Sequence, residues 1–294
     1  MPPSPLAEGD GETPLPLDAE ALRRWPMPEA SQLDKFRRGT VLIVGGHRST
    51  PGAVLLAGVA ALRMGAGRLQ IATDEDIAAH VAVAAPEAMV VGLPCRHGEL
   101  ELTDEIAGRL GDADSLVVGP GLVGDTPPTR LLGELSELSR PDTLFVIDAL
   151  AIGAFADLDE RHREMLASRV VMTPNRQEVL RIGGCPEDAD LPASLRAAAH
   201  GSGAVITSFG LVQAPDGRCW RTTEPSSGLG TSGSGDVLAG LVGGAAARCR
   251  DPLQAACWAT YAHMESGRRV SREVATAGYL ARELLDHVPQ CLPT

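Results

Sequence analysis

The feature that most constrains the fold is an alternation that begins at Thr40, where short runs of β-branched residues and leucine are separated by stretches rich in alanine and leucine. This alternation is typical of βαβ units, in which helices cover both faces of an apolar, mainly parallel sheet. It predicts the α/β fold class. We expect strands at 40–45, 68–72, 88–92, 115–119, 143–149, 169–174 and 204–208.

The segments on either side of these strands predict the remaining organisation. Residues 1–34 are rich in proline and acidic residues, and we expect them to form a leader with one short helix at 17–24. No change of composition divides residues 35–294, which we expect to form a single domain. Further elements are predicted as a hairpin over 211–221 and helices at 236–249, 252–270 and 275–287.

Charge and composition exclude several classes of function. The chain has 26 basic and 38 acidic residues, a net charge of −12, and only 3% aromatic residues, which disfavours binding to nucleic acid by charge or by base stacking. Lys35 is the only lysine, so the sequence has no P-loop and no other candidate for a Schiff base. The six scattered cysteines predict reduced thiols and no metal site. No apolar run is long enough to span a membrane, and we expect a cytoplasmic protein.

The stretch GLGTSGSGDVLAGLVGG, residues 228–244, is the most informative motif. A glycine-rich loop enters an apolar helix, so unpaired N–H groups with the helix dipole behind them predict an anion site. Asp236 lies at this junction. It is either a general base beside a bound phosphate or a residue that only caps the helix.

Polar residues also follow four of the predicted strands, at the sheet edge where ligands of open α/β sheets bind. In the loop 45–50, Thr50 is a candidate cap for the next helix, and Gly119 and Gly121 would permit close approach of a ligand. Asp148 ends an apolar strand, where a carboxylate is costly unless it meets a cation, hydrogen-bond donors or a metal. The alternative is that Asp148 caps the next helix. The remaining candidates are Thr173, Asn175 and Glu178, the first two of which are alternatively helix caps.

Taken in order, these stretches resemble the ADP/ATP-dependent NAD(P)H-hydrate dehydratases over about residues 35–288. The stretches are GTVLIVGGHRSTPGAVLLAGVAALRMGAGRLQIAT, PEAMV, VVGPGL, VMTP, the PDG hairpin and GLGTSGSGDVLAGLVGG. The resemblance implies the ribokinase-like fold, a three-layer α/β/α domain. It also implies dehydration of the S form of NADHX or NADPHX to NADH or NADPH, driven by cleavage of ADP or ATP with Mg²⁺. Relatives often form homo-oligomers, including tetramers, and often carry an epimerase domain that we expect this chain to lack.

The resemblance assigns roles to individual residues. Asp236 corresponds to the base that activates the substrate hydroxyl and also contacts the substrate. The nucleotide and its transferred phosphate are contacted by Gly233, Ser234, Gly235 and Gly210, and the hydrated dinucleotide by Ala53, Gly121 and Asn175.

Three positions depart from the family pattern. Asn175 stands where a histidine is usual, Phe209 where a lysine precedes Gly210, and Leu150 where a second acid follows Asp148. The loss of an ammonium group and an acid leaves a catalytically impaired, nucleotide-binding homologue as an alternative. A small-molecule kinase of the same fold is the other alternative, because the Asp236 loop suits phosphoryl transfer to any hydroxyl.

Overall fold

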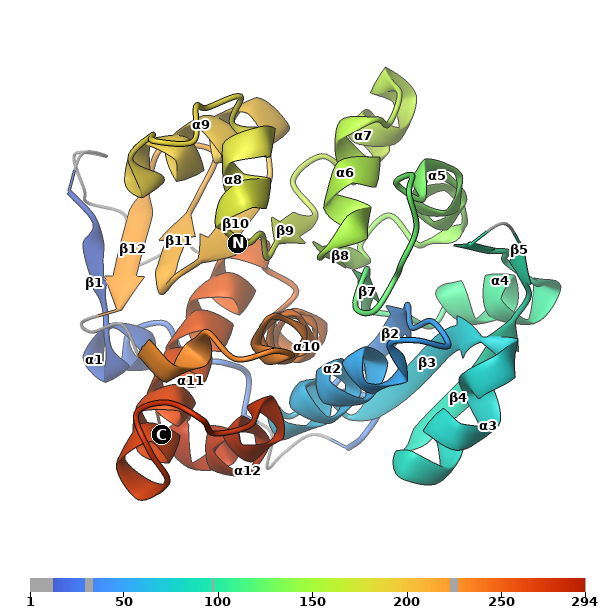
Figure 1. Cartoon of the computed structure of the whole chain (residues 1–294), viewed down its shortest axis with the longest axis horizontal. Helices are drawn as coiled ribbons and strands as arrows, with labels where there is room; N and C mark the ends of the chain where they lie inside the picture. The colour runs from blue at the N-terminus through green and yellow to red at the C-terminus, as the bar shows by residue number, and fades with distance from the viewer. Residues whose placement is uncertain (1–12, 30–33, 97, 223–226, 294) are drawn as a thin grey trace.

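A ten-stranded, mostly parallel sheet forms the centre of the molecule (Figure 1). The computed structural model describes residues 13–29, 34–96, 98–222 and 227–293. All seven predicted strands are confirmed: β2 (Thr40–Val44), β3 (Arg68–Asp74), β4 (Ala88–Leu93), β7 (Ser115–Val118), β8 (Leu144–Ile147), β9 (Val170–Met172) and β10 (Val205–Ser208). The predicted hairpin is also confirmed, as β11 (Leu211–Gln213) and β12 (Cys219–Thr222).

The order of the strands fixes where a ligand site belongs. The sheet runs β1-β12-β11-β10-β9-β8-β7-β2-β3-β4. The chain passes from β2 outward to β4 and then returns as β7 on the other side of β2. The carboxyl ends of β2 and β7 therefore form the point at which the strand order reverses, where open α/β sheets bind their ligands.

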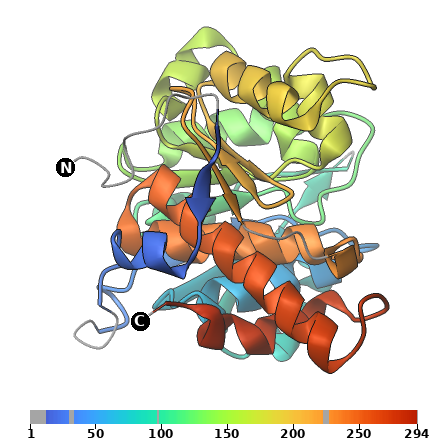
Figure 2. The ribbon, with the colours of Figure 1, turned by 90° about the vertical axis from the view of Figure 1, so that its left-hand side faces the viewer.

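Two layers of helices cover the sheet, one on each face (Figure 2). One core contains α1 (Ala19–Arg23), α2 (Pro51–Arg63), α3 (Glu75–Ala84), α10 (Ser234–Cys249), α11 (Pro252–Glu273) and α12 (Ala281–Cys291). The other contains α4 (Asp104–Leu110), α5 (Thr129–Leu138), α6 (Leu150–Ala156), α7 (Glu160–Leu166), α8 (Arg176–Ile182) and α9 (Leu191–Ser202). This arrangement confirms the α/β fold class with three layers.

Helix α10 is buried along most of its length between the sheet and its neighbours. A Cβ atom at Gly240 would lie 2.1 Å from the Ala57 carbonyl oxygen of α2, and one at Gly243 would lie 2.4 Å from Val117 of β7. Only glycine permits backbones to pack this closely. The start of α10 is therefore held in a fixed place beside the carboxyl edge of the sheet.

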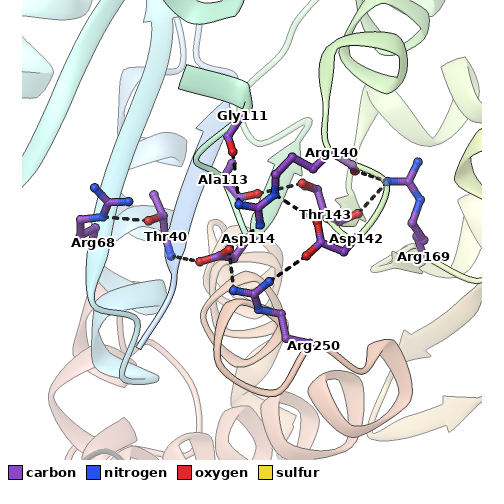
Figure 3. A network of polar contacts seen from close by, with 10 residues as sticks. All are labelled: Thr40, Arg68, Gly111, Ala113, Asp114, Arg140, Asp142, Thr143, Arg169 and Arg250. Carbon is purple, nitrogen blue, oxygen red and sulfur yellow. Dashed lines mark hydrogen bonds and ion pairs between the residues drawn. The ribbon is translucent and has the colours of Figure 1, made fainter. Parts of the chain in front are cut away.

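The amino edge of the sheet is joined by a network of charged groups (Figure 3). One carboxylate oxygen of Asp114 accepts a hydrogen bond of 2.8 Å from the Thr40 N–H. The other oxygen lies 2.7 Å from the guanidinium of Arg140 and 2.6 Å from that of Arg250, which follows α10. This network connects β2, β7, the turn before β8 and the end of α10.

The ends of the chain differ in part from the sequence prediction. The short N-terminal helix is confirmed as α1, but the strand β1 (Leu15–Leu17), which pairs in parallel with β12, was not predicted. The helix predicted at 275–287 is misplaced, because α11 continues to Glu273 and α12 begins only at Ala281. Gly278, whose φ is 95°, lies in the turn between them. A small additional hairpin joins β5 (Cys95–Arg96) and β6 (Glu99–Leu100).

Candidate active site

The glycine-rich loop ends at the amino end of α10. Gly233 precedes the helix with a φ of 87°, and no side chain caps the helix there. The backbone N–H groups of Gly235 and Asp236 have no acceptor within the described chain. Two free N–H groups with the helix dipole behind them can bind an anion, as the motif predicts.

Asp236 lies in the first turn of α10 and is not its cap, so the capping alternative is wrong. Its side chain is half-buried, and one carboxylate oxygen lies 3.9 Å from the Cβ position of Gly233. Burial raises the pKa of Asp236 from 3.8 to about 6. A carboxylate with this pKa is mostly ionised at neutral pH and is a better proton acceptor than an ordinary aspartate.

The hydroxyl of Ser234 is paired with a histidine that the motif analysis missed. Ser234 Oγ lies 3.0 Å from Nε2 of His263 in α11, and both side chains are buried. Burial lowers the pKa of His263 to about 4, so the ring is neutral at physiological pH. The pair fixes the Ser234 side chain, which leaves the nearby backbone N–H groups as the donors available to an anion.

Asp148 lies at the end of β8 and is not a helix cap, because Ala149 occupies that position before α6. The Thr173 hydroxyl donates a hydrogen bond of 2.7 Å to the buried Asp148 carboxylate. Burial raises the pKa of Asp148 to about 7, and the negative charges of Asp236 and Glu178 raise it further. The three acids therefore share one electrostatic environment.

The backbone around Asp148 is strained. Ala149 has a φ of 48° and a ψ of −129°, outside the regions that alanine ordinarily adopts. A Cβ atom at Gly119 would lie 1.9 Å from the Asp148 carbonyl oxygen, so the two strand ends press together. Strain of this kind persists where the surrounding structure fixes a functional side chain.

Asn175 begins α8 and forms a reciprocal capping box with Glu178. The Asn175 side-chain oxygen accepts a bond of 3.1 Å from the Glu178 N–H, and a Glu178 oxygen accepts one of 2.8 Å from the Asn175 N–H. The capping alternative for Asn175 is thus confirmed. Its amide NH₂ group remains available to a ligand.

A cavity of about 510 Å³ lies beside the start of α10. It brings together four of the predicted site residues, which come from three separate loops: Asn175, Gly210, Ser234 and Gly235. Residues of α11 also line it, among them Thr260, His263 and Met264. No sequence motif identifies these three, because they lie on one face of an otherwise ordinary buried helix.

Two further predicted residues, Ala53 and Gly121, lie next to each other, outside the lining of this cavity. The Cβ position of Gly121 lies 2.8 Å from Cβ of Ala53. Thr50 occupies the N-cap position of α2, as predicted, but its hydroxyl makes no capping bond. It donates instead a bond of 2.8 Å to the Gly121 carbonyl oxygen and ties the two glycine loops together. One turn beyond Ala53, Leu56 contacts the Gly233 position, so α2 connects these loops to the start of α10.

Comparison with known proteins agrees with this geometry. A carbohydrate-kinase-type family described as NAD(P)H-hydrate dehydratase matches residues 41–290. The chain is 38% identical over 285 residues to the ADP-dependent (S)-NAD(P)H-hydrate dehydratase of Xanthomonas campestris, covering 94% of this chain and 95% of that protein. It is 32% identical over 275 residues to the bifunctional NAD(P)H-hydrate repair enzyme of Escherichia coli, covering 91% of this chain and 50% of that enzyme.

Solved structures show the same fold. The ADP/ATP-dependent NAD(P)H-hydrate dehydratase of Bacillus subtilis, co-crystallized with ATP/Mg²⁺, superposes with a TM-score of 0.74 at 25% identity, covering 95% of this chain and 98% of that one. A ribokinase-like superfamily protein of Enterococcus faecalis superposes with a TM-score of 0.82 at 24% identity, covering 97% and 96% of the two chains. The chain belongs to the NAD(P)H-hydrate dehydratase family and has the ribokinase-like fold.

Proposed function

We propose that this chain is a hydro-lyase that dehydrates the S form of hydrated NADH or NADPH and cleaves ADP, or alternatively ATP, in doing so. The observation that carries the proposal is the carboxylate of Asp236. It is half-buried, has a raised pKa and lies beside two free N–H groups at the start of α10. The Xanthomonas campestris relative, which matches nearly the whole chain, bears the name of this activity.

In this proposal Asp236 accepts the proton of the hydroxyl on the hydrated ring. The oxygen then attacks the terminal phosphorus of the nucleotide, and the bond to the departing AMP or ADP breaks. Elimination of phosphate, together with loss of a proton from the neighbouring ring carbon to solvent, restores the double bond of the reduced cofactor. The N–H groups of Gly235 and Asp236 would stabilise the charge on the transferred phosphoryl group. The balanced products with ADP are reduced cofactor, AMP and phosphate.

The nucleotide and the hydrated cofactor would approach Asp236 from opposite sides. We assign the nucleotide to the cavity beside α10, with Gly210, Gly233, Ser234 and Gly235 as contacts. The joined glycine loops, with Ala53 and Gly121, would contact the hydrated cofactor. Asn175 lines the nucleotide-side cavity, and its free amide NH₂ could reach a ligand there.

The acids of the site fit a magnesium ion that binds together with the nucleotide. Asp148 and Glu178 both have pKa values raised by burial, although the charge of Arg181 partly offsets this rise at Glu178. No group of three or more acidic, histidine or cysteine side chains that could hold a metal is found in the described part of the chain. Mg²⁺ usually binds through one or two carboxylates plus substrate phosphates, and Asp148 and Glu178 would supply these carboxylates. The ion would neutralise charge on the phosphates.

The test is recovery of the absorbance of the reduced nicotinamide ring when the protein is incubated with hydrated NADPH and Mg²⁺. ADP and ATP are supplied in separate reactions, and a reaction without nucleotide is the control. We expect nucleotide-dependent recovery with a stoichiometric release of phosphate. Absence of recovery with either nucleotide, beside an active relative, would contradict the proposal. Phosphorylation of thiazole or pyrimidine alcohols in its place would identify a kinase.

A further inference from the structure

The turn between β10 and β11 contains an unusual residue. Ser208 pairs with Leu211, so only Phe209 and Gly210 form the turn. Their φ values are 50° and 75°, which is the pattern of a type I′ hairpin turn. Such turns favour Asn-Gly or Gly-Gly, and a bulky aromatic residue at positive φ is a genuine outlier.

Burial does not compensate for this strain, because 60% of the Phe209 surface is exposed. A phenyl ring that is both strained and exposed contributes little to folding. Strained residues that persist commonly lie at ligand sites. Phe209 lies at such a place, since it lines the cavity beside the start of α10.

The lining of this cavity contains both polar and apolar residues. Ser234, Gly235 and Asn175 are among the polar residues, and the free N–H groups of α10 lie beside them. Phe209 belongs to the apolar residues, with Leu229, Leu238 and Met264. Among the described lining residues there is no lysine or arginine. A phosphate here would meet backbone dipoles and no cationic side chain, so contacts to the base are a further source of affinity for a nucleotide.

We infer that Phe209 binds the purine base of the nucleotide by aromatic stacking, so that the base anchors the ligand. The inference rests on the proposed nucleotide dependence of the site and adds the group that recognises the nucleotide. The flat, apolar face of a purine matches the exposed ring and the apolar lining beside it, and base stacking on an aromatic side chain contributes substantially to binding. The phosphates then extend toward the start of α10.

The test is equilibrium binding of ADP, adenosine and inorganic pyrophosphate to the parent protein and three variants. Phe209→Asn removes the ring and places a favoured residue in the turn, so its Tm should equal or exceed that of the parent. Phe209→Tyr keeps the ring. Phe36→Asn removes another exposed phenylalanine, 58% exposed, that does not line the cavity and is the matched control.

Phe209→Asn should weaken the binding of ADP and adenosine by about 5- to 150-fold and leave pyrophosphate binding unchanged. Phe209→Tyr and Phe36→Asn should bind ADP as the parent does. Unchanged ADP affinity in Phe209→Asn, or an equal loss for adenosine and pyrophosphate, would overturn the inference. These measurements need no hydrated cofactor. Stacking could thus be established in a protein that fails the dehydration assay, or refuted in one that passes it.

Discussion

Each edge of the sheet contains a buried aspartate, and the two aspartates have different partners. At the amino edge, Asp114 is 5% exposed and pairs with two arginines and a backbone N–H. At the carboxyl edge, Asp148 is 6% exposed, yet its carboxylate receives one threonine hydroxyl and no cationic partner within the described chain. Equal burial therefore has different consequences. The first acid holds strands together, whereas burial, with the nearby charges of Asp236 and Glu178, raises the pKa of the second to about 7.

The backbone conformations at the two edges also differ. At the amino edge Arg250 adopts the allowed left-handed conformation, with a φ of 57° and a ψ of 24°. Arginine side chains there also bind carbonyl groups, as the Arg140 guanidinium does with the Gly111 oxygen. The carboxyl edge has Ala149 in a strained conformation and glycine loops pressed against each other. The amino edge therefore contributes contacts that stabilise the fold, whereas the carboxyl edge contains the groups that are available to a ligand.

The largest expected effect comes from removing the proton acceptor at the carboxyl edge. Asp236→Asn keeps the shape but cannot accept a proton, so dehydration should fall by about 10²- to 10⁴-fold with little change in Tm. In the parent, kcat/KM should decrease as the pH is lowered through about 6, since Asp236 becomes protonated. Initial rates and thermal unfolding check both points, with the exposed Asp112→Asn as control. Equal rates for Asp236→Asn and the parent would refute its role as a base.

The second prediction removes the charge of the buried aspartate at the amino edge. Asp114→Asn removes the charge that pairs with Arg140 and Arg250, and it should lower the free energy of unfolding by about 2–3 kcal/mol. Because the network is remote from the ligand site, kcat should stay the same below the unfolding temperature. Urea unfolding and initial rates measure the two quantities. A loss of kcat without a loss of stability would show that the edges are not separate in function.

The third prediction concerns the pH dependence of stability. The native pKa of Asp148, about 7, exceeds the unfolded value of 3.8, so the native state binds more protons between these values and loses stability as the pH rises through them. Asp148→Asn can still accept the Thr173 hydrogen bond without a charge. It should exceed the parent by about 4 kcal/mol in free energy of unfolding at pH of about 8, the difference disappearing below pH of about 4.

Urea unfolding of both proteins at several pH values, without nucleotide or Mg²⁺, tests this expectation. Glu187→Gln, which alters another acid outside the site, should show the same pH dependence as the parent. If the difference in free energy of unfolding between Asp148→Asn and the parent stays constant with pH, the pKa of the Asp148 carboxyl group is not raised in the native state.

Much of the fold could be predicted because the strands are apolar runs long enough to require cover on both faces. The edge strand β1 could not, since its three residues include a proline in a proline-rich segment, and such a strand is tolerated only because it lies at the edge. The start of α12 was also mispredicted. Its helical pattern extends backward past Gly278, whose positive φ interrupts it.

The site was predictable where a motif lies in one loop and not where distant segments meet. The loop at 228–236 identifies Asp236, but the bond between Asp148 and Thr173 joins the ends of two strands, and His263 comes from a helix without a motif. The roles of the individual site residues stay predictions. So do the oligomeric state, the cytoplasmic location and the division between residues 1–34 and 35–294. No helix in the described residues is long and apolar enough to cross a membrane.

Helix α10 runs from Asp236 in its first turn to Arg250, which pairs with Asp114 at the far edge of the sheet. At 16 residues it is about 24 Å long, and its glycines leave no space for a Cβ atom against α2 and β7. The proposed base thus lies at one end of a closely packed helix whose other end is held by the Asp114 network. Heat inactivation should consequently coincide with global unfolding, because the active site cannot unfold locally before the whole domain unfolds.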